Sequence, residues 1–305
     1  MKEIKNVLIC GIGAVGSIYA NKINEHNSEN LRILVDTQRL EKYKNSPKIF
    51  NGKELKFNYI LPEAKDYKAD LIIIATKYDG LLQAVENIAN FISEDTIILS
   101  LLNGVTSEQI LAEKYGAQHV LLSYFIGHSA MRQGNIINHD GVGKIVFGAR
   151  GKDSKLVEQE NIKRVKEFFE KTKIEYQIPD DMYHSLWLKF MLNVSTNQPS
   201  AILKMTFGQM QSNEKFIKFM VEIMKEVQIL AQKEGVNNTE TMIDEALISF
   251  NQMSKNGKTS MLQDIEAGRK TEMEMFAGHI IKLGEKYNIP TPYNKILKEL
   301  IEIIS

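Results

Sequence analysis

Cysteine is almost missing from this chain of 305 residues, which contains only Cys10. One thiol cannot form an internal disulfide, so a disulfide-stabilised secreted scaffold is excluded and a reducing compartment is expected. Cys10 lies within the apolar run NVLIC, which is typical of a core strand. We therefore expect a buried structural thiol instead of a reactive one.

An excess of charge of one sign is also missing, because 38 basic residues balance 38 acidic residues. This balance argues against the positive field of a nucleic-acid-binding protein. Long hydrophobic runs are missing too, since DLIIIAT is far too short to span a bilayer and the N-terminus lacks the apolar core of a signal peptide. We expect a cytoplasmic protein that binds neither nucleic acid nor membranes.

The first half of the chain alternates between strand and helix patterns. Amphipathic segments separate apolar runs at NVLICGIG, LRILVD, LIIIAT, TIILSLLN and HVLLSYFIG. The alternation predicts an α/β unit, with a mostly parallel sheet covered by helices on both faces. In GNIINHDGVGKIVFGA, short β runs and glycine turns follow one another without a helix, which predicts an antiparallel addition to the sheet.

The second half contains long helical patterns and no strand-like run. Its last pattern, MLQDIEAGRKTEMEMFAGHIIKLGEKYN, predicts one continuous helix. We place a domain boundary near Pro179. The expected domains are a dinucleotide-binding, Rossmann-type domain over 1–179 and an all-α domain that binds substrate over 180–305.

The segment GIGAVG has the G-x-G-x-x-G spacing between a strand and a helix, and this context favours dinucleotide binding over a plain turn. Gly11 permits a tight turn, Gly13 lets the backbone approach a pyrophosphate, and Gly16 lets the helix pack closely. Free N–H groups at the helix start attract phosphate. The expected phosphate-binding loop also includes Ala14 and Val15.

The side chains after the second strand give conflicting signals about the dinucleotide. Asp36 lies twenty positions after Gly16, where a carboxylate accepts hydrogen bonds from a ribose 2′-OH and favours NAD. Arg39 and Lys42 could instead pair with the 2′-phosphate of NADP. Taken alone, Asp36 favours NAD slightly.

The segment SLWLKFMLNVSTNQPS is apolar almost all round, yet Lys189, Asn193 and Asn197 recur every four residues on one helical face. We call these three residues the polar row. The side chain of Lys189 could extend to water. Alternatively, the polar row could form hydrogen bonds with a neighbouring helix, or it could line a substrate cleft. In a chain that binds a dinucleotide, two stacked amides favour the cleft. Reduction of a ketone needs a proton donor, which Lys189 can be.

The segment TSMLQDIEAGRKTE supplies two further candidates. Ser260 and Gln263 resemble a capping box, which predicts a helix N-terminus where a substrate carboxylate would also be stabilised. Glu272 would lie about 120° round the same predicted helix. By itself it is expected to face solvent, and only a place beside Lys189 would give it a catalytic role.

Together these motifs resemble the ketopantoate reductase (2-dehydropantoate 2-reductase) family. The resemblance runs through GIGAVGS, Asn103–Gly104, GVGKIVFGA, WLKFMLNVSTN, SMLQDIEAGRKTE and NIPTPYN. It implies that Lys189 is the general acid, that Asn193 and Asn197 bind substrate, and that Ser260 holds the carboxylate of the keto acid. Glu272 would contact the substrate or Lys189, beside the cofactor. Asn103 would lie between the nicotinamide and the substrate, and Lys77 would lie near the cofactor. The implied donor is NADPH.

The chain departs from the family pattern at two positions. A substrate-binding asparagine is common about ten residues after the one that matches Asn197, where this chain has Phe207. Another usually lies three residues before the serine that matches Ser260, where this chain has Gly257 beside Asn256. Both departures concern substrate recognition, and neither concerns the lysine.

The sequence therefore predicts NAD(P)H-dependent reduction of a 2-keto acid to a 2-hydroxy acid. The leading reaction is 2-dehydropantoate to pantoate, in pantothenate and coenzyme A biosynthesis. The alternatives are another 2-keto acid and a non-catalytic dinucleotide sensor, against which Lys189 argues. We expect a small-molecule substrate between the two domains, no metal, and a monomer or homodimer.

Overall fold

The computed structural model describes residues 2–127, 130–141, 143–151 and 156–305, so Val142 of the expected β region lies outside the described residues. The chain divides into two compact units, Met1–Met182 and Tyr183–Ser305. Within the described residues, no helix has both the length and the apolar character that crossing a membrane requires.

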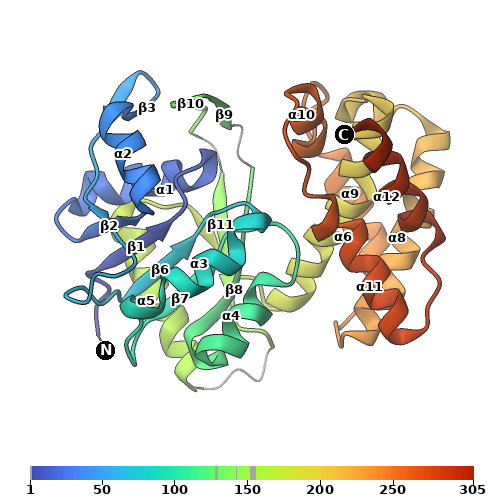
Figure 1. The fold of residues 1–305 in the computed structure, drawn as a ribbon. Helices are drawn as coiled ribbons and strands as arrows, with labels where there is room; N and C mark the ends of the chain where they lie inside the picture. Colours follow the sequence, from blue (N-terminus) through green and yellow to red (C-terminus); the bar gives the residue numbers. More distant parts are fainter. Residues whose placement is uncertain (1, 128–129, 142, 152–155) are drawn as a thin grey trace. The chain divides into compact units, whose positions relative to one another are not determined.

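The first unit is built on an eight-stranded sheet (Figure 1). From edge to edge its strands are β12 (Tyr176–Gln177), β11 (Lys144–Gly148), β8 (Val120–Ile126), β7 (Ile97–Ser100), β6 (Leu71–Ile74), β1 (Val7–Cys10), β2 (Leu31–Leu34) and β5 (Tyr59–Ile60). Strand β11 runs antiparallel to β8, and the other neighbouring pairs are parallel. The prediction of a mostly parallel sheet with an antiparallel addition is confirmed for β11.

The rest of the predicted addition belongs to a different sheet, and there the prediction is wrong. Four short strands form a second sheet in the order β4 (Lys53–Leu55), β3 (Lys48–Phe50), β10 (Ile136–His139) and β9 (Ala130–Gln133). Asn51 joins β3 to β10, because its side chain accepts from His139 N at 2.8 Å and donates to His139 O at 3.0 Å. Since this partner lies far away in the sequence, the local pattern did not reveal it.

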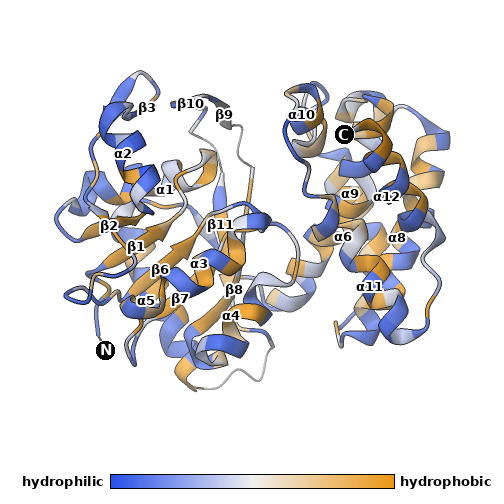
Figure 2. Cartoon of the chain, in the orientation of Figure 1, coloured by the Kyte–Doolittle hydropathy of each residue, from blue (hydrophilic) through white to orange (hydrophobic). Residues whose placement is uncertain are grey.

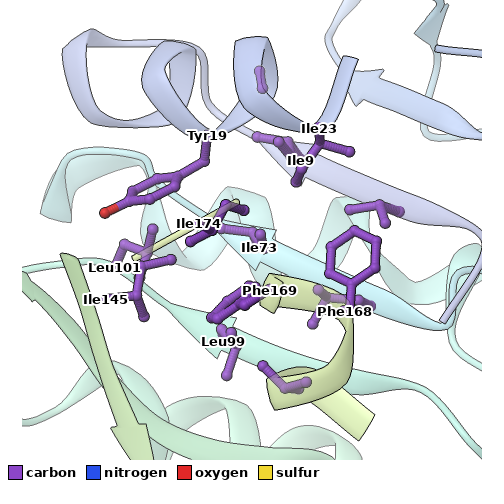
Figure 3. Packing of buried hydrophobic residues seen from close by; sticks show 14 of the residues in the cluster. Ile9, Tyr19, Ile23, Ile73, Leu99, Leu101, Ile145, Phe168, Phe169 and Ile174 are labelled. Carbon is purple, nitrogen blue, oxygen red and sulfur yellow. The ribbon is translucent and has the colours of Figure 1, made fainter. Parts of the chain in front are cut away.

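Helices cover both faces of the large sheet because successive residues of a strand point to opposite faces. Ile9, Ile33, Ile73 and Leu99 pack on one face, under helices α1 (Ala14–Asn27) and α5 (Leu156–Thr172). Figure 3 shows Tyr19 of α1 and Phe168 and Phe169 of α5 among the residues of this core. Both faces of the strands are therefore buried, and Figure 2 shows the central strands as hydrophobic.

The opposite face packs under helices α3 (Leu81–Asn87) and α4 (Ser107–Tyr115), and its core includes Leu8, Cys10 and Ile74. Burial raises the pKa of the Cys10 thiol to about 12. A thiol with so high a pKa is protonated at neutral pH and unreactive. The prediction that Cys10 is a buried thiol in a core strand is confirmed.

The described residues of the second unit form helices without a strand, as predicted. The α-helices are α6 (Met182–Leu203), α7 (Phe207–Gln211), α8 (Glu214–Lys233), α9 (Met242–Asn251), α10 (Ser260–Glu266), α11 (Ala277–Tyr287) and α12 (Pro292–Ile304). Aromatic rings join α6 to the start of α11. The ring centroids of Trp187 and Phe190 are 5.5 Å apart, and those of Phe190 and Phe276 are 6.4 Å apart.

The single helix predicted for MLQDIEAGRKTEMEMFAGHIIKLGEKYN is wrong, because α10 ends at Glu266 and α11 begins at Ala277. Gly268 has a φ of +60°. Its N–H donates to Ile265 O at 3.0 Å, and the next N–H, that of Arg269, donates to Asp264 O at 2.8 Å. This bonding pattern ends a helix at a glycine. Glu272 therefore lies outside α10. The predicted angle of about 120° between Ser260 and Glu272 assumed one continuous helix, so it does not apply.

Candidate active site

Two glycines of the loop after β1 leave no room for a side chain. Gly11 has a φ of +97°, and a Cβ on it would lie 2.8 Å from the carbonyl carbon of Ala75, which follows β6. A Cβ on Gly16 would lie only 1.9 Å from the carbonyl oxygen of Gly11. The loop therefore folds tightly between β6 and the first turn of α1.

Gly13 differs, because no described atom would lie within 4 Å of a Cβ built on it. Gly13 is the N-cap of α1, and as a glycine it has no side chain that could accept a hydrogen bond from the first turn. The next residues, Ala14 and Val15, are partly buried. Open space above a glycine, at a helix start without a capping acceptor, suits the close approach of a pyrophosphate.

The order of the strands also favours ligand binding at this edge. From β1 the chain adds β2 and β5 on one side and then continues with β6 on the other side, so the direction of strand order reverses beside β1. Ligands of open α/β sheets bind outside the carboxyl ends of the strands at such a reversal. The exposed Lys77 follows β6 there, and the partly buried Asn103 follows β7.

The sequence reasoning missed Thr76, which lies between Ala75 and Lys77. Its hydroxyl oxygen is buried and has no hydrogen-bond partner among the described residues. A buried hydroxyl without a partner is costly, so a ligand that bonds to it would gain free energy. The only signal in the sequence was a threonine at the end of the apolar run LIIIAT.

A buried network, also missed, holds the turn that carries Asn103. Ser100, at the end of β7, donates to the Ser107 hydroxyl at 2.8 Å, and Ser107 donates to the Glu108 carboxylate at 2.8 Å. The other oxygen of Glu108 lies 3.4 Å from Ser123 N on β8. Because all these groups are buried, they fix both ends of the turn that contains Asn103.

Asp36 has a structural role that the sequence analysis did not assign to it. It is the N-cap of α2 (Thr37–Asn45), and its carboxylate accepts from Arg39 N at 2.6 Å. The Arg39 guanidinium lies 3.3 Å from the second carboxylate oxygen. Asp36 is thus held in place by the helix start, and it partly neutralises the charge of Arg39.

The polar row lies along α6, and its members are buried to different degrees. Lys189 and Asn193 are partly buried, whereas Asn197 is buried. The helix is fixed by Gln198, which accepts from Ala277 N at 3.2 Å at the start of α11. A row carried by a helix fixed in this way is suited to holding a bound molecule in one orientation.

Ser260 lies beside the row, because Asn197 Nδ2 is 3.5 Å from the Ser260 hydroxyl. The predicted N-cap is wrong by one residue, since the side chain of Thr259 accepts from Leu262 N at 3.2 Å. Ser260 is therefore the first residue of α10, and its exposed side chain is not used for capping. A hydroxyl at a helix start is well suited to a carboxylate.

The partly buried Glu272 lies on the segment that connects α10 to α11. It precedes the 3-10 turn Met273–Met275. Next in the chain is Phe276, whose ring stacks on that of Phe190, the residue after Lys189. The segment with Glu272 is thus tied to α6 close to the lysine. The catalytic and binding roles of Glu272 and the polar row stay predictions.

Comparisons with known proteins agree along the chain. The family model described as Ketopantoate reductase PanE/ApbA matches residues 7–152, and the model of its C-terminal part matches residues 181–305. The 2-dehydropantoate 2-reductase of Pyrococcus horikoshii is 27% identical over 301 residues, which are 97% of this chain and 96% of that protein. The 2-dehydropantoate 2-reductase of Streptococcus pyogenes serotype M1 is 25% identical over 299 residues, with the same coverage.

Among solved structures, that of D-mandelate dehydrogenase with NADH and anilino(oxo)acetate has a TM-score of 0.85 to this chain. The two sequences are 24% identical, and the match covers 98% of each chain. At this identity the likeness establishes a shared fold.

Proposed function

Because the chain belongs to the ketopantoate reductase family, we propose that it reduces a 2-keto acid to a 2-hydroxy acid with a reduced nicotinamide dinucleotide. The observation that carries the proposal is the polar row on α6, with Ser260 beside it. A purely structural helix does not need a half-buried lysine in line with two amides.

In this proposal each residue has a defined task. The bound dinucleotide supplies the hydride, and Lys189 donates the proton that the keto oxygen needs. Asn193 and Asn197 orient the substrate by hydrogen bonds, and Ser260 holds its carboxylate at the start of α10. Glu272 engages the substrate or Lys189.

The first unit holds the dinucleotide in this proposal. The open space at Gly13, at the start of α1, receives the pyrophosphate, and Thr76 and Lys77 lie beside it at the end of β6. Asn103, on the turn after β7, lies between nicotinamide and substrate.

For the dinucleotide, the geometry at Asp36 supports NADH over the NADPH that the resemblance implied. A carboxylate fixed as a helix cap can accept hydrogen bonds from ribose hydroxyls, but it repels a 2′-phosphate. Arg39, one of the two cations that could pair with a 2′-phosphate, is already paired with this carboxylate. D-mandelate dehydrogenase, which shares the fold, was solved with NADH.

Two substrates deserve comparison in the first assays. The relatives named 2-dehydropantoate 2-reductase support 2-dehydropantoate. The likeness to D-mandelate dehydrogenase supports a different 2-keto acid as the second candidate.

Activity assays test the proposal. The purified chain should oxidise NADH or NADPH in the presence of at least one member of a panel of 2-keto acids, followed by absorbance at 340 nm. A chain that binds the dinucleotide tightly but reduces none of these acids would be a sensor, and the proposed function would be wrong.

A further inference from the structure

The two positions at which the chain departs from the family pattern are neighbours in the second unit. Phe207 N donates to Gly257 O at 3.0 Å, and Gly208 N donates to Lys255 O at 2.8 Å. The start of α7 thus lies against the turn that precedes α10. Two departures that are far apart in the sequence form one local change in the structure.

The ring of Phe207 covers Gly257. A Cβ on Gly257 would lie 3.0 Å from Cδ2 of Phe207, closer than side chains normally pack. On another side the ring meets that of the buried Phe250 edge to face, with centroids 6.4 Å apart. Phe207 itself is only partly buried, so some of its ring is accessible.

This aromatic surface adjoins the expected place of the substrate. Gly257 lies three residues before Ser260, whose hydroxyl is 3.5 Å from Asn197 Nδ2. Between them, Thr259 donates to the Ser200 hydroxyl at 3.1 Å, which fixes the turn to the last part of α6. The turn that contains Gly257, which the ring covers, is therefore bonded to the last part of α6, just after Asn197.

The threonines around the ring already have other hydrogen bonds. Thr206 forms a capping box with Gln209 at the start of α7, with distances of 2.8 and 3.4 Å. Thr259 caps α10. Asn256 is exposed on the turn beside Gly257. Its amide could bind a substrate hydroxyl there, so an experiment has to test this residue.

We propose that the substrate is a 2-keto acid with an apolar branch or ring at C3, and that it lacks the terminal hydroxyl of 2-dehydropantoate. The proposal rests on the proposed reduction of a 2-keto acid. A hydroxyl placed against the ring of Phe207 loses its hydrogen bonds to water without replacement, whereas a methyl group gains by leaving water.

Two substrates that differ only at this hydroxyl test the proposal. In 3,3-dimethyl-2-oxobutanoate, a hydrogen replaces the hydroxyl of 2-dehydropantoate. We expect kcat/KM to be higher for 3,3-dimethyl-2-oxobutanoate by roughly 10- to 200-fold. Equal values, or a preference for 2-dehydropantoate, would overturn the proposal. If no 2-keto acid is reduced, the proposed function itself fails.

Variants then show whether the ring sets the preference. Phe207→Asn should shift the ratio of the two kcat/KM values towards 2-dehydropantoate by about tenfold or more. Phe207→Tyr, which keeps the ring and adds a hydroxyl, should shift it in the same direction and guards against misfolding of the first variant. The matched control is Phe219→Asn on α8, where a partly buried ring packs on Tyr293.

The control should lose some stability and leave the ratio unchanged. If neither variant at Phe207 alters the ratio while both melt cooperatively, the ring does not select the substrate. If Asn256→Ala abolishes a measurable activity on 2-dehydropantoate, that amide binds the hydroxyl and the proposal is wrong.

Discussion

The glycine loop after β1 and the polar row on α6 are built in opposite ways. The loop depends on missing side chains, since Gly11 and Gly16 have no room for a Cβ and Gly13 leaves space open. The row depends on side chains that distant residues hold in place. Ser260 lies beside Asn197, and Ala277 is bonded to the next residue of α6, Gln198. A backbone site can therefore be encoded by six consecutive residues, whereas a side-chain site needs the tertiary fold.

The largest effect is expected at Lys189. Replacement by alanine should lower kcat by a factor on the order of 10² to 10⁴, the usual contribution of a positioned general acid. Dinucleotide affinity, measured by fluorescence titration, should change little because the loop is untouched. Lys218→Ala, an exposed lysine on α8, is the control. If the Lys189 variant keeps most of its turnover, another group supplies the proton.

Within the loop, two alanine substitutions should separate folding from binding. Gly16→Ala should lower the free energy of unfolding by roughly 1–3 kcal/mol or more, because the new Cβ overlaps Gly11 O. Gly13→Ala should cost less than about 1 kcal/mol of stability. It should still raise the dinucleotide Kd about tenfold or more, by filling the space that the pyrophosphate needs. If Gly13→Ala binds the dinucleotide as tightly as the wild type, the pyrophosphate does not approach Gly13 closely and the prediction is wrong.

A smaller change is expected from Asp36→Ser, because serine also caps helices and only the negative charge is lost. The ratio of kcat/KM with NADH to that with NADPH should fall by roughly tenfold, since an exposed charge pair is worth on the order of 1 kcal/mol. Glu41→Ser on the same helix should leave the ratio unchanged. A wild-type enzyme that strongly prefers NADPH would show that Asp36 does not repel the phosphate.

The last prediction concerns stability instead of activity, at His279 on α11, whose ring packs edge to face on Phe190 at 5.8 Å. Burial lowers the pKa of His279 to about 4. The unfolded chain binds the proton near pH 6.5, so the contribution of His279 to stability should fall as the pH drops from about 6.5 towards 4 and should be constant above pH 6.5. The loss should be on the order of 1–2 kcal/mol, because the ring is not fully shielded from water.

Hydrogen exchange at pH 7.5 and pH 5 can locate this loss. Amides of the helical unit should lose more protection at the lower pH in the wild type than in His279→Gln. If the wild type and the variant respond equally to pH, the histidine is not responsible.

Several features could be predicted from local patterns in the sequence. The apolar runs predicted strands buried on both faces, and residues such as Ile9 and Leu8 do pack into cores on opposite sides of the sheet. The spacing of Lys189, Asn193 and Asn197 placed them along one helix, and the structure has α6 there. The helical pattern continues on both sides of Gly268 and so does not reveal the end of α10, although the glycine itself is a typical helix stop.

The sequence by itself determined the alternation of strands and helices in the first unit, the helical character of the second, the glycine loop and the residues of the polar row. These features depend on backbone preferences and on contacts between residues close in the chain. Only the tertiary structure decided that β10 pairs with β3, that Ser260 lies beside Asn197, and that Phe207 covers Gly257. Such contacts join residues far apart in sequence, and the free energy that selects them comes from the packing of the whole unit.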